Sequence, residues 1–158
     1  MMKDNIFEID HYAITVRDLK KTREFYEDIL GFEFAGQLQT ENGDDVLAYP
    51  SYEDLTGVPG VKFKIMFMKG YGITLEFLEY VYPEEIVIDT KPYIRGTAHL
   101  CFHAKDADKA YEELSAKGVE LCASKAVRIE GGTHEGVRAF YFKDPDGFLL
   151  EIKTEARV

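Results

Sequence analysis

The spacing of apolar and polar residues predicts a strand followed by a helix near the start of the chain. Between Ile9 and Val16 larger apolar side chains alternate with small or polar ones, which is the period of a half-buried strand. A helical spacing follows, with Asp18 suited to the N-cap and Gly31 to the C′ position. The apolar stripe of this predicted helix is Leu19, Thr22, Phe25, Tyr26 and Ile29.

The same order returns in the second half of the chain. The segment TAHLCFHAKDADKAYEELSAKGVEL, residues 97–121, again reads as a strand and then a helix, with Asp106 as the cap and Gly118 as the stop. Its apolar stripe is Ala107, Ala110, Tyr111 and Leu114. The sequence therefore contains an internal repeat.

Strand-like runs complete each half. They are VKFKIMFM and GITLEFLEY in the first half and VRAFYFKD and GFLLEIKT in the second, separated by Gly-containing turns. Each half thus reads as βαβββ. Because two equivalent modules are expected to share one interior, we predict an α+β fold with a single domain over 1–158. In it, modules at about 6–80 and 95–154, joined by a linker at 81–94, pair into a curved, cup-shaped mixed sheet.

Composition narrows the possible partners. The formal net charge is −10 and the pI is near 4.9, which opposes the basic surface that nucleic-acid binding needs and disfavours anionic membranes. The N-terminus has no apolar leader and no apolar run is long enough to span a bilayer, so we expect a cytoplasmic protein. Cys101 and Cys122 show neither CxxC spacing nor a disulfide pattern. We predict that both are buried and pack as small apolar side chains.

Two histidines and two glutamates occupy equivalent places in the modules. His11 lies 88 residues before His99, and Glu76 lies 75 residues before Glu151. The difference predicts an insertion in the first half, which the polar stretch Thr40–Gly60 can hold, and loops of this kind often cover a site.

These four side chains share one kind of surface. Alternation places each of them on the sheet face opposite the bulky apolar residues that belong under the helix. Imidazole and carboxylate together suit Zn, Ni, Co, Mn or Fe, and a cation would explain Glu151 in an apolar strand. The alternative is a solvated face carrying ordinary polar residues. Because all four repeat in register, we favour one divalent metal ion bound by His11, Glu76, His99 and Glu151.

Several further side chains have two interpretations. Glu79 is rejected as a ligand because it falls on the face opposite Glu76 and has no glutamate counterpart in the second half. Three aromatic residues could line an apolar cavity or simply pack in the core. They are Tyr49, Tyr52 and Phe67.

Other polar residues are weaker candidates. His103 shares the face of His99 and suits a pocket rim or a hydrogen-bonded role, while His134 lies in a Gly-rich loop and is expected to be solvated. Arg128 and Arg138 could bind a substrate carboxylate or phosphate, although solvated surface charges are commoner. Gly131 and Gly132 match no phosphate-binding pattern.

The repeated pattern resembles the vicinal oxygen chelate superfamily, which includes glyoxalase I, methylmalonyl-CoA epimerase, extradiol dioxygenases and fosfomycin-resistance proteins. The resemblance rests on IDHYAITVRDLKKTREFYEDILGFEF, GITLEFLE, GTAHLCFHAKDADKAYEELSAKGVEL and AFYFKDPDGFLLEI, and it covers almost the whole chain.

What the resemblance implies is a glyoxalase I-like lyase or isomerase. It implies a divalent metal, an enediolate formed from a small substrate with adjacent oxygens, Glu151 as the base, and Glu76 as the alternative base. The glutamate at position 76 favours this type over epimerases, which commonly have glutamine there, and over dioxygenases. No residues match those by which glyoxalase I holds glutathione.

The same resemblance leaves other functions open. An epimerase of acyl-CoA thioesters, an Fe(II) dioxygenase and a non-catalytic drug-binding protein share the scaffold, although such binders generally lack the four ligands. It also implies a homodimer, because related proteins often complete their paired modules across subunits.

Overall fold

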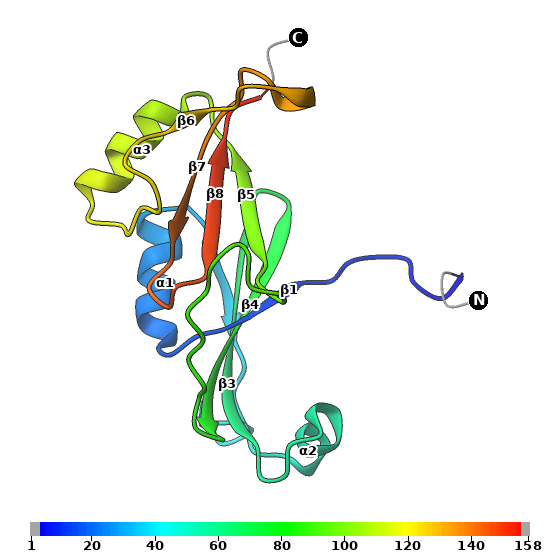
Figure 1. The fold of residues 1–158 in the computed structure, drawn as a ribbon. Helices are drawn as coiled ribbons and strands as arrows, with labels where there is room; N and C mark the ends of the chain where they lie inside the picture. Colours follow the sequence, from blue (N-terminus) through cyan, green and yellow to red (C-terminus); the bar gives the residue numbers. More distant parts are fainter. Residues whose placement is uncertain (1–3, 156–158) are drawn as a thin grey trace. The chain divides into compact units, whose positions relative to one another are not determined.

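The computed structural model describes residues 4–155, which divide into two compact units between Ile86 and Val87. This boundary falls within the predicted linker, 81–94. Figure 1 traces the chain through the helices and strands of each unit.

The first unit is a four-stranded mixed sheet with the strand order β1-β4-β3-β2. β1 pairs with β4 in parallel, and the other neighbours pair antiparallel. The elements are β1 (Tyr12–Thr15), α1 (Leu19–Asp28), β2 (Glu33–Gln37), α2 (Pro50–Thr56), β3 (Lys62–Gly70) and β4 (Ile73–Tyr82).

The second unit repeats this path with the strand order β5-β8-β7-β6. Here β5 and β8 form the parallel pair. The elements are β5 (His99–His103), α3 (Ala107–Ala116), β6 (Val127–Arg128), the short 3₁₀ helix η2 (Gly132–His134), β7 (Arg138–Lys143) and β8 (Leu149–Lys153). The α+β class and the βαβββ order of each half are thereby confirmed.

The helix ends follow from the residues that the sequence places there. The Asp18 carboxylate accepts hydrogen bonds from the backbone N–H groups of Lys20 and Lys21, and the Asp106 carboxylate accepts one from Lys109. Gly31 and Gly118 follow the two helices with φ values of 76° and 75°, in the left-handed region that glycine enters without strain. Both predicted caps and both predicted stops are confirmed.

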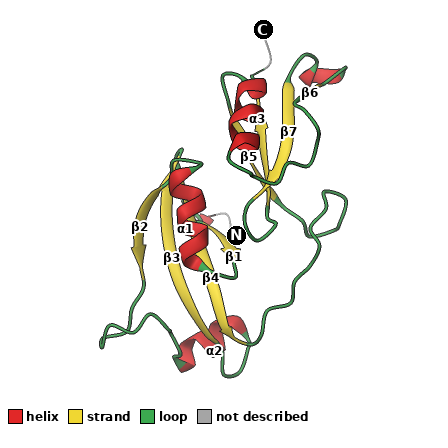
Figure 2. Cartoon of the chain, turned by 90° about the vertical axis from the view of Figure 1, so that its left-hand side faces the viewer, coloured by secondary structure: helices red, strands yellow, loops and turns green. Residues whose placement is uncertain are grey.

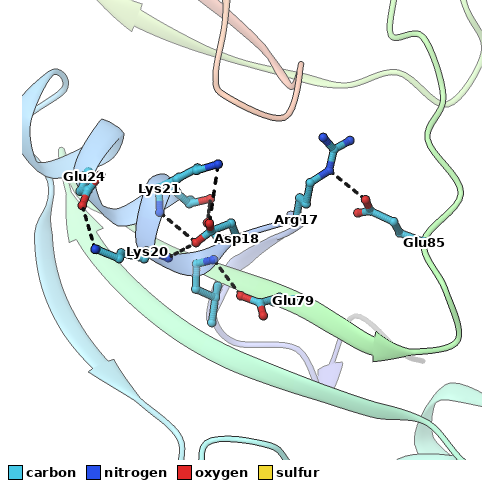
Figure 3. A network of polar contacts seen from close by, with 9 residues as sticks. Arg17, Asp18, Lys20, Lys21, Glu24, Glu79 and Glu85 are labelled. Atoms are coloured by element: carbon cyan, nitrogen blue, oxygen red, sulfur yellow. Dashed lines mark hydrogen bonds and ion pairs between the residues drawn. The ribbon is translucent and has the colours of Figure 1, made fainter.

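A carboxylate from β4 also helps to fix the start of α1. Glu79, labelled in Figure 3, accepts at Oε2 a hydrogen bond of 2.9 Å from the backbone N–H of Leu19. The other carboxylate oxygen of Glu79 lies 3.1 Å from Nζ of Lys64 on β3. Glu79 therefore works on the helix side of the sheet, which agrees with its rejection as a metal ligand.

The helices α1 and α3 each cover one face of their own sheet (Figure 2). Under α1 lie buried side chains from β1, β3 and β4, and under α3 lie those of β7 and β8. The alternation in the sequence predicts these faces correctly. The buried residues include Ile14, Tyr26, Met68, Leu75 and Phe77 in the first unit and Leu114, Phe140, Phe142, Leu150 and Ile152 in the second.

The insertion at 40–60 contains α2 and forms a second apolar cluster. Leu47 bridges to Phe63 of β3 and packs with Val61 and Ile65, and Tyr52 of α2 joins the cluster. Phe63 and Ile65 alternate with the buried residues under α1, so they lie on the other face of the sheet. The insertion thus covers part of the face that carries Glu76.

Two expectations differ from the structure. The strand predicted to begin at Ile9 begins at Tyr12, so His11 precedes it. Cys101 and Cys122 are exposed rather than buried, and for Cys101 the reason is that it shares the sheet face of His99. No helix among residues 4–155 is both long enough and apolar enough to cross a membrane.

Candidate metal centre

Each unit brings one predicted histidine against one predicted glutamate. Nε2 of His11 lies 3.2 Å from Oε2 of Glu76 in the first unit, and Nε2 of His99 lies 3.1 Å from Oε2 of Glu151 in the second. The structure therefore forms two equivalent imidazole–carboxylate pairs from residues far apart in the sequence.

Strand register explains why the pairs form. Ala13 of β1 is the partner of Glu76 on β4, and Cys101 of β5 is the partner of Glu151 on β8. Each histidine lies two residues before that partner, on the same sheet face. The two histidine–glutamate pairs, called half-sites below, are thus built by the same register of equivalent parallel strands, β1 with β4 and β5 with β8.

An aromatic ring supports each histidine. Phe67 is the cross-strand partner of Glu76 and lies edge-on to His11, with 6.2 Å between ring centroids. Tyr141 is the partner of Glu151 and lies edge-on to His99, at 5.2 Å. Tyr141 is not among the residues predicted from the sequence, although counting the β7–β8 register back from the turn would have placed it beside Glu151.

Both carboxylates are largely withdrawn from water. The side chains of Glu76 and Glu151 are 14% and 18% exposed, against 35% and 42% for His11 and His99. A carboxylate in such surroundings needs a proton, a hydrogen-bond donor or a cation to stabilise it. The histidine is the group within reach in each unit.

Asp10 adds a second carboxylate to the first pair. Its Oδ1 lies 2.6 Å from Nδ1 of His11. This hydrogen bond raises the pKa of His11 above its ordinary value, with burial opposing it and the charge of Glu76 adding to it. Asp10 is not among the residues predicted from the sequence, and its counterpart in the second unit is Ala98.

Nε2 of His11 and Oε2 of Glu76 need a proton or a cation between them. An ionised carboxylate can only accept hydrogen bonds, so Nδ1 carries the hydrogen that Asp10 accepts. In the neutral ring Nε2 is then an acceptor, and it faces another acceptor, Oε2 of Glu76. A divalent cation could take the place of the proton that this arrangement favours.

The second pair has a thiol and a phenol hydroxyl as neighbours, and the charge of Lys153 also acts on the thiol. Partial desolvation of the sulfur by neighbouring residues, followed by a hydrogen bond to Glu151 and the charge of Glu151, raises the pKa of the Cys101 thiol to about 11, although the residue as a whole is exposed. Burial and the charges of Glu151 and Cys101 raise the pKa of the Tyr141 hydroxyl. At neutral pH both groups keep their protons, and the Cys101 thiol is a neutral hydrogen-bond donor to Glu151.

The distance between the donor atoms of each pair fits two adjacent ligands of one divalent ion. Two adjacent ligands of an octahedral ion with bonds of about 2.1 Å lie about 3.0 Å apart. The donor atoms of the pairs lie 3.2 and 3.1 Å apart. No group of three or more His, Cys, Asp or Glu side chains that could hold a metal ion occurs within residues 4–155, so the four-ligand centre remains a prediction.

Comparison with known families now identifies the scaffold. Residues 8–152 match the family model described as Glyoxalase/Bleomycin resistance protein/Dioxygenase superfamily. The chain belongs to this superfamily.

Relatives within the superfamily carry out different reactions. A 2-epi-5-epi-valiolone epimerase from Actinomyces is 30% identical over 145 residues, covering 91% of this chain and 77% of that protein. A lactoylglutathione lyase from Schizosaccharomyces pombe is 24% identical over 159 residues, covering 95% of this chain and 48% of that protein. The superfamily therefore includes enzymes that catalyse different reactions.

Solved structures agree in fold. A glyoxalase family protein from Bacillus cereus has a TM-score of 0.78 with 20% identity, covering 99% of both chains. A glyoxalase I mutant from Zea mays has a TM-score of 0.63 with 18% identity, covering 93% of this chain and 45% of that chain. At these identities the likeness concerns the fold.

The remaining predicted residues lie away from the pairs or have other roles. Tyr52 packs edge-on against Phe63 with ring centroids 4.9 Å apart, which makes it a core residue of the insertion cluster. Phe67 packs against the same cluster and against His11. Tyr49, the N-cap of α2, is exposed, and so is His134 in η2.

A cavity of about 1110 Å³ opens in the second unit at the start of α3. His103 and Arg128 line it, as do the acidic Asp106 and Glu135. Arg138 also lines it, but its guanidinium already donates to the Asp108 carboxylate and to the Ala126 carbonyl. Arg138 therefore ties β7 to α3, and acidic side chains offset the basic residues of the cavity.

Proposed function

We propose that the protein is a divalent-metal-dependent isomerase or lyase of glyoxalase I type, acting on a small substrate with adjacent oxygens. The observation that carries this proposal is the repeated imidazole–carboxylate pair, His11 with Glu76 and His99 with Glu151, built in the same register in both units. An ordinary solvated face would not require two largely buried carboxylates, each 3.1–3.2 Å from an imidazole nitrogen.

The proposed ligands are these four residues, with one ion of Zn, Ni, Co, Mn or Fe. When bound, the ion would supply Lewis acidity, stabilising the negative charge that develops on a substrate oxygen when a neighbouring carbon loses its proton. The two carboxylates of the protein would balance the charge of the ion. A carboxylate beside the substrate would then move a proton between adjacent carbons, first as general base and then as general acid.

Glu151 is the proposed proton carrier. Its neighbours Cys101 and Tyr141 hold their protons at neutral pH, so neither competes with Glu151 as a base. Glu76 faces His11, whose other nitrogen already contacts Asp10, so this half carries more negative charge with which to hold a cation. This asymmetry favours Glu76 as a lasting ligand and Glu151 as the group that moves a proton.

Epimerisation is the second candidate. It is favoured by the relative of 30% identity, whose name describes an epimerase of a valiolone. Epimerisation and the glyoxalase reaction both begin with removal of a proton from a carbon beside a carbonyl group. The same four residues would serve either reaction, and the substrate would decide between them.

The first test replaces Glu151 by glutamine. We expect turnover to fall by about a hundredfold or more, the contribution of general acid–base catalysis, while much of the metal stays bound because the amide oxygen can still act as a ligand. The measurements are metal content after purification, isomerisation of the hemithioacetal of methylglyoxal, and deuterium exchange in cyclic ketones.

The matched control is Glu113→Gln, the same change on the exposed Glu113 of α3, which should keep wild-type turnover. Wild-type turnover in Glu151→Gln would end the assignment of the base. Iron-dependent catechol cleavage would instead support a dioxygenase, and a purified protein that binds no divalent ion would support a drug-binding role.

A further inference from the structure

We propose that Asp10 is a positioning residue for His11, which holds the Nδ1–H of the imidazole and so directs the Nε2 lone pair toward Glu76 and a divalent cation. The proposal rests on the proposed metal site, but its first part concerns the metal-free protein and can be tested there.

The geometry of the imidazole supports this role. Nδ1 of His11 lies 2.6 Å from Asp10, while Nε2 lies 3.2 Å from Glu76, so each ring nitrogen has its own carboxylate. Because a carboxylate accepts only, the shorter contact assigns the hydrogen of a neutral ring to Nδ1. The nitrogen left to bind a cation is then the one beside Glu76, as a ligand imidazole with an outer carboxylate requires.

The position of His11 in the fold gives it a need for such a partner. His11 precedes β1, which begins at Tyr12, so no ladder pairing holds its backbone. His99 is the first residue of β5 and pairs with Leu149. The aromatic support is also looser for His11, with ring centroids 6.2 Å apart against 5.2 Å for His99. The half-site with the less constrained histidine is therefore the one that has an added carboxylate.

The two half-sites are not symmetric at this position. The residue before His99 is Ala98, so the second half-site has no such carboxylate. The two half-sites share their ligand types and their register, but only His11 has a second carboxylate, that of Asp10, on its other ring nitrogen. A device present in only one half points to a role in orienting His11 rather than to a general requirement of the fold.

The exposure of Asp10 to water limits the size of the effect. The Asp10 side chain is 92% exposed, so water weakens its interaction with His11. Loss of an outer partner of a metal ligand typically lowers metal affinity by about 10-fold to 100-fold. We expect Asp10→Ala to lie at the lower end, near tenfold, and Asp10→Asn to lose less because its amide oxygen can still accept from Nδ1–H.

The experiment measures tautomer and metal affinity separately. In metal-free protein at a pH where His11 is neutral, nitrogen NMR should show the Nδ1–H form of His11 dominating in the wild type and losing dominance in Asp10→Ala. Calorimetric titration with Ni²⁺ should show about tenfold weaker binding for Asp10→Ala. The matched control is Glu8→Ala, an exposed acidic residue of the same segment without a hydrogen bond or ion pair inside residues 4–155, which should match the wild type.

The two outcomes are distinct from those of the proposed function. An unchanged His11 tautomer in Asp10→Ala, or Ni²⁺ affinity within twofold of the wild type, would overturn the role of Asp10. An equal loss of Ni²⁺ affinity in Glu8→Ala would also overturn the role of Asp10, because the loss would then follow from the change in net charge alone. Normal turnover in Glu151→Gln would contradict the assignment of the base and leave the role of Asp10 intact.

Discussion

The imidazole of His11 lies between two carboxylates, whereas that of His99 lies beside one carboxylate and a tyrosine edge. Equivalent residues thus have unequal surroundings. In the first half the surroundings carry negative charge, which favours a bound cation. In the second half the Cys101 thiol and the Tyr141 hydroxyl keep their protons at neutral pH, which suits the proposed role of Glu151 as the proton carrier. Chemistry at this scale depends on the nearest two or three groups, because screening by water weakens more distant charges at an exposed face.

The pKa of the Cys101 thiol depends on its contact with Glu151. Its pKa of about 11 means that the thiolate, the form that reacts, is scarce at neutral pH. In a metal-free Cys122→Ser background, we expect the rate of alkylation of Cys101 by iodoacetamide to rise with pH toward a midpoint near 11. Mass spectrometry of the modified peptide measures this rate.

In Glu151→Gln the midpoint of Cys101 alkylation should shift to lower pH. Glu151 raises the pKa of the thiol by hydrogen bonding and by its charge, so its neutralisation should move the midpoint to lower pH. Burial, the largest cause, is unchanged and should keep the midpoint above the ordinary cysteine value. A midpoint that does not move would show that Cys101 and Glu151 are not in contact.

At the scale of elements, β4 serves both faces of its sheet. Glu76 points to the face that carries His11, and Glu79, three residues later, bonds the first N–H of α1 on the other face. The odd spacing places the two carboxylates on opposite sides of the strand. One strand therefore carries a proposed ligand and also anchors the helix that covers the core.

Replacing Glu79 by alanine should destabilise the fold without affecting the metal. Loss of its bond to Leu19 N–H and of its charge near the N-terminus of α1 should cost about 1 kcal/mol, the scale of a helix cap. Urea denaturation measures this cost, and Ni²⁺ titration should give wild-type affinity. Glu24→Ala, which removes an exposed carboxylate 4.0 Å from Lys20 on the same helix (Figure 3), is the control and should change stability by less than about 0.5 kcal/mol.

A loss of metal affinity in Glu79→Ala would contradict this division of the strand. It would mean that Glu79, rather than Glu76, faces the cation.

At the scale of the whole molecule, the proposal requires both units. Each unit provides one imidazole and one carboxylate, and two protein ligands alone hold a divalent ion weakly in competition with water. The proposed centre therefore predicts one ion per chain rather than one per unit. It also makes metal binding a source of stability for the folded state, since a ligand that binds only the folded protein raises its stability.

Removal of either histidine tests this requirement. We expect His11→Ala and His99→Ala each to lower Ni²⁺ affinity by at least about tenfold and to abolish the rise in melting temperature that Ni²⁺ gives the wild type. Two ions per wild-type chain, or undiminished affinity in either variant, would contradict a single shared centre.

The same variants test the proposed homodimer. Sedimentation should give twice the chain mass of 18.1 kDa. If ligands come from two chains, a mixture of the inactive variants should regain about a quarter of the wild-type activity, because random pairing of two-fold dimers restores that share of sites.

Much of the fold follows from local patterns in the sequence. The caps Asp18 and Asp106 and the stops Gly31 and Gly118 lie where the sequence places them, because a cap needs only its own few residues. The two sheet faces also follow, since alternation is a property of the extended chain itself. The equivalent places of the two histidines and the two glutamates follow from the repeat, whereas the pairing of each histidine with its glutamate within a unit depends on the register of the parallel strands.

Other features depend on contacts between distant segments. Alternation along a strand places neighbouring residues on opposite faces, so it cannot predict the contact of Asp10 with His11, which forms because the strand begins only at Tyr12. The exposure of Cys101 and the support from Tyr141 likewise depend on which segments cover a face. By itself the sequence determined the elements, their faces and the equivalent places of the four proposed ligands, because these follow from the fixed periods of helix and strand and from the internal repeat. The tertiary structure alone decided which histidine contacts which glutamate and what surrounds each pair, because these contacts are set by strand register and by long-range packing, which no local period encodes.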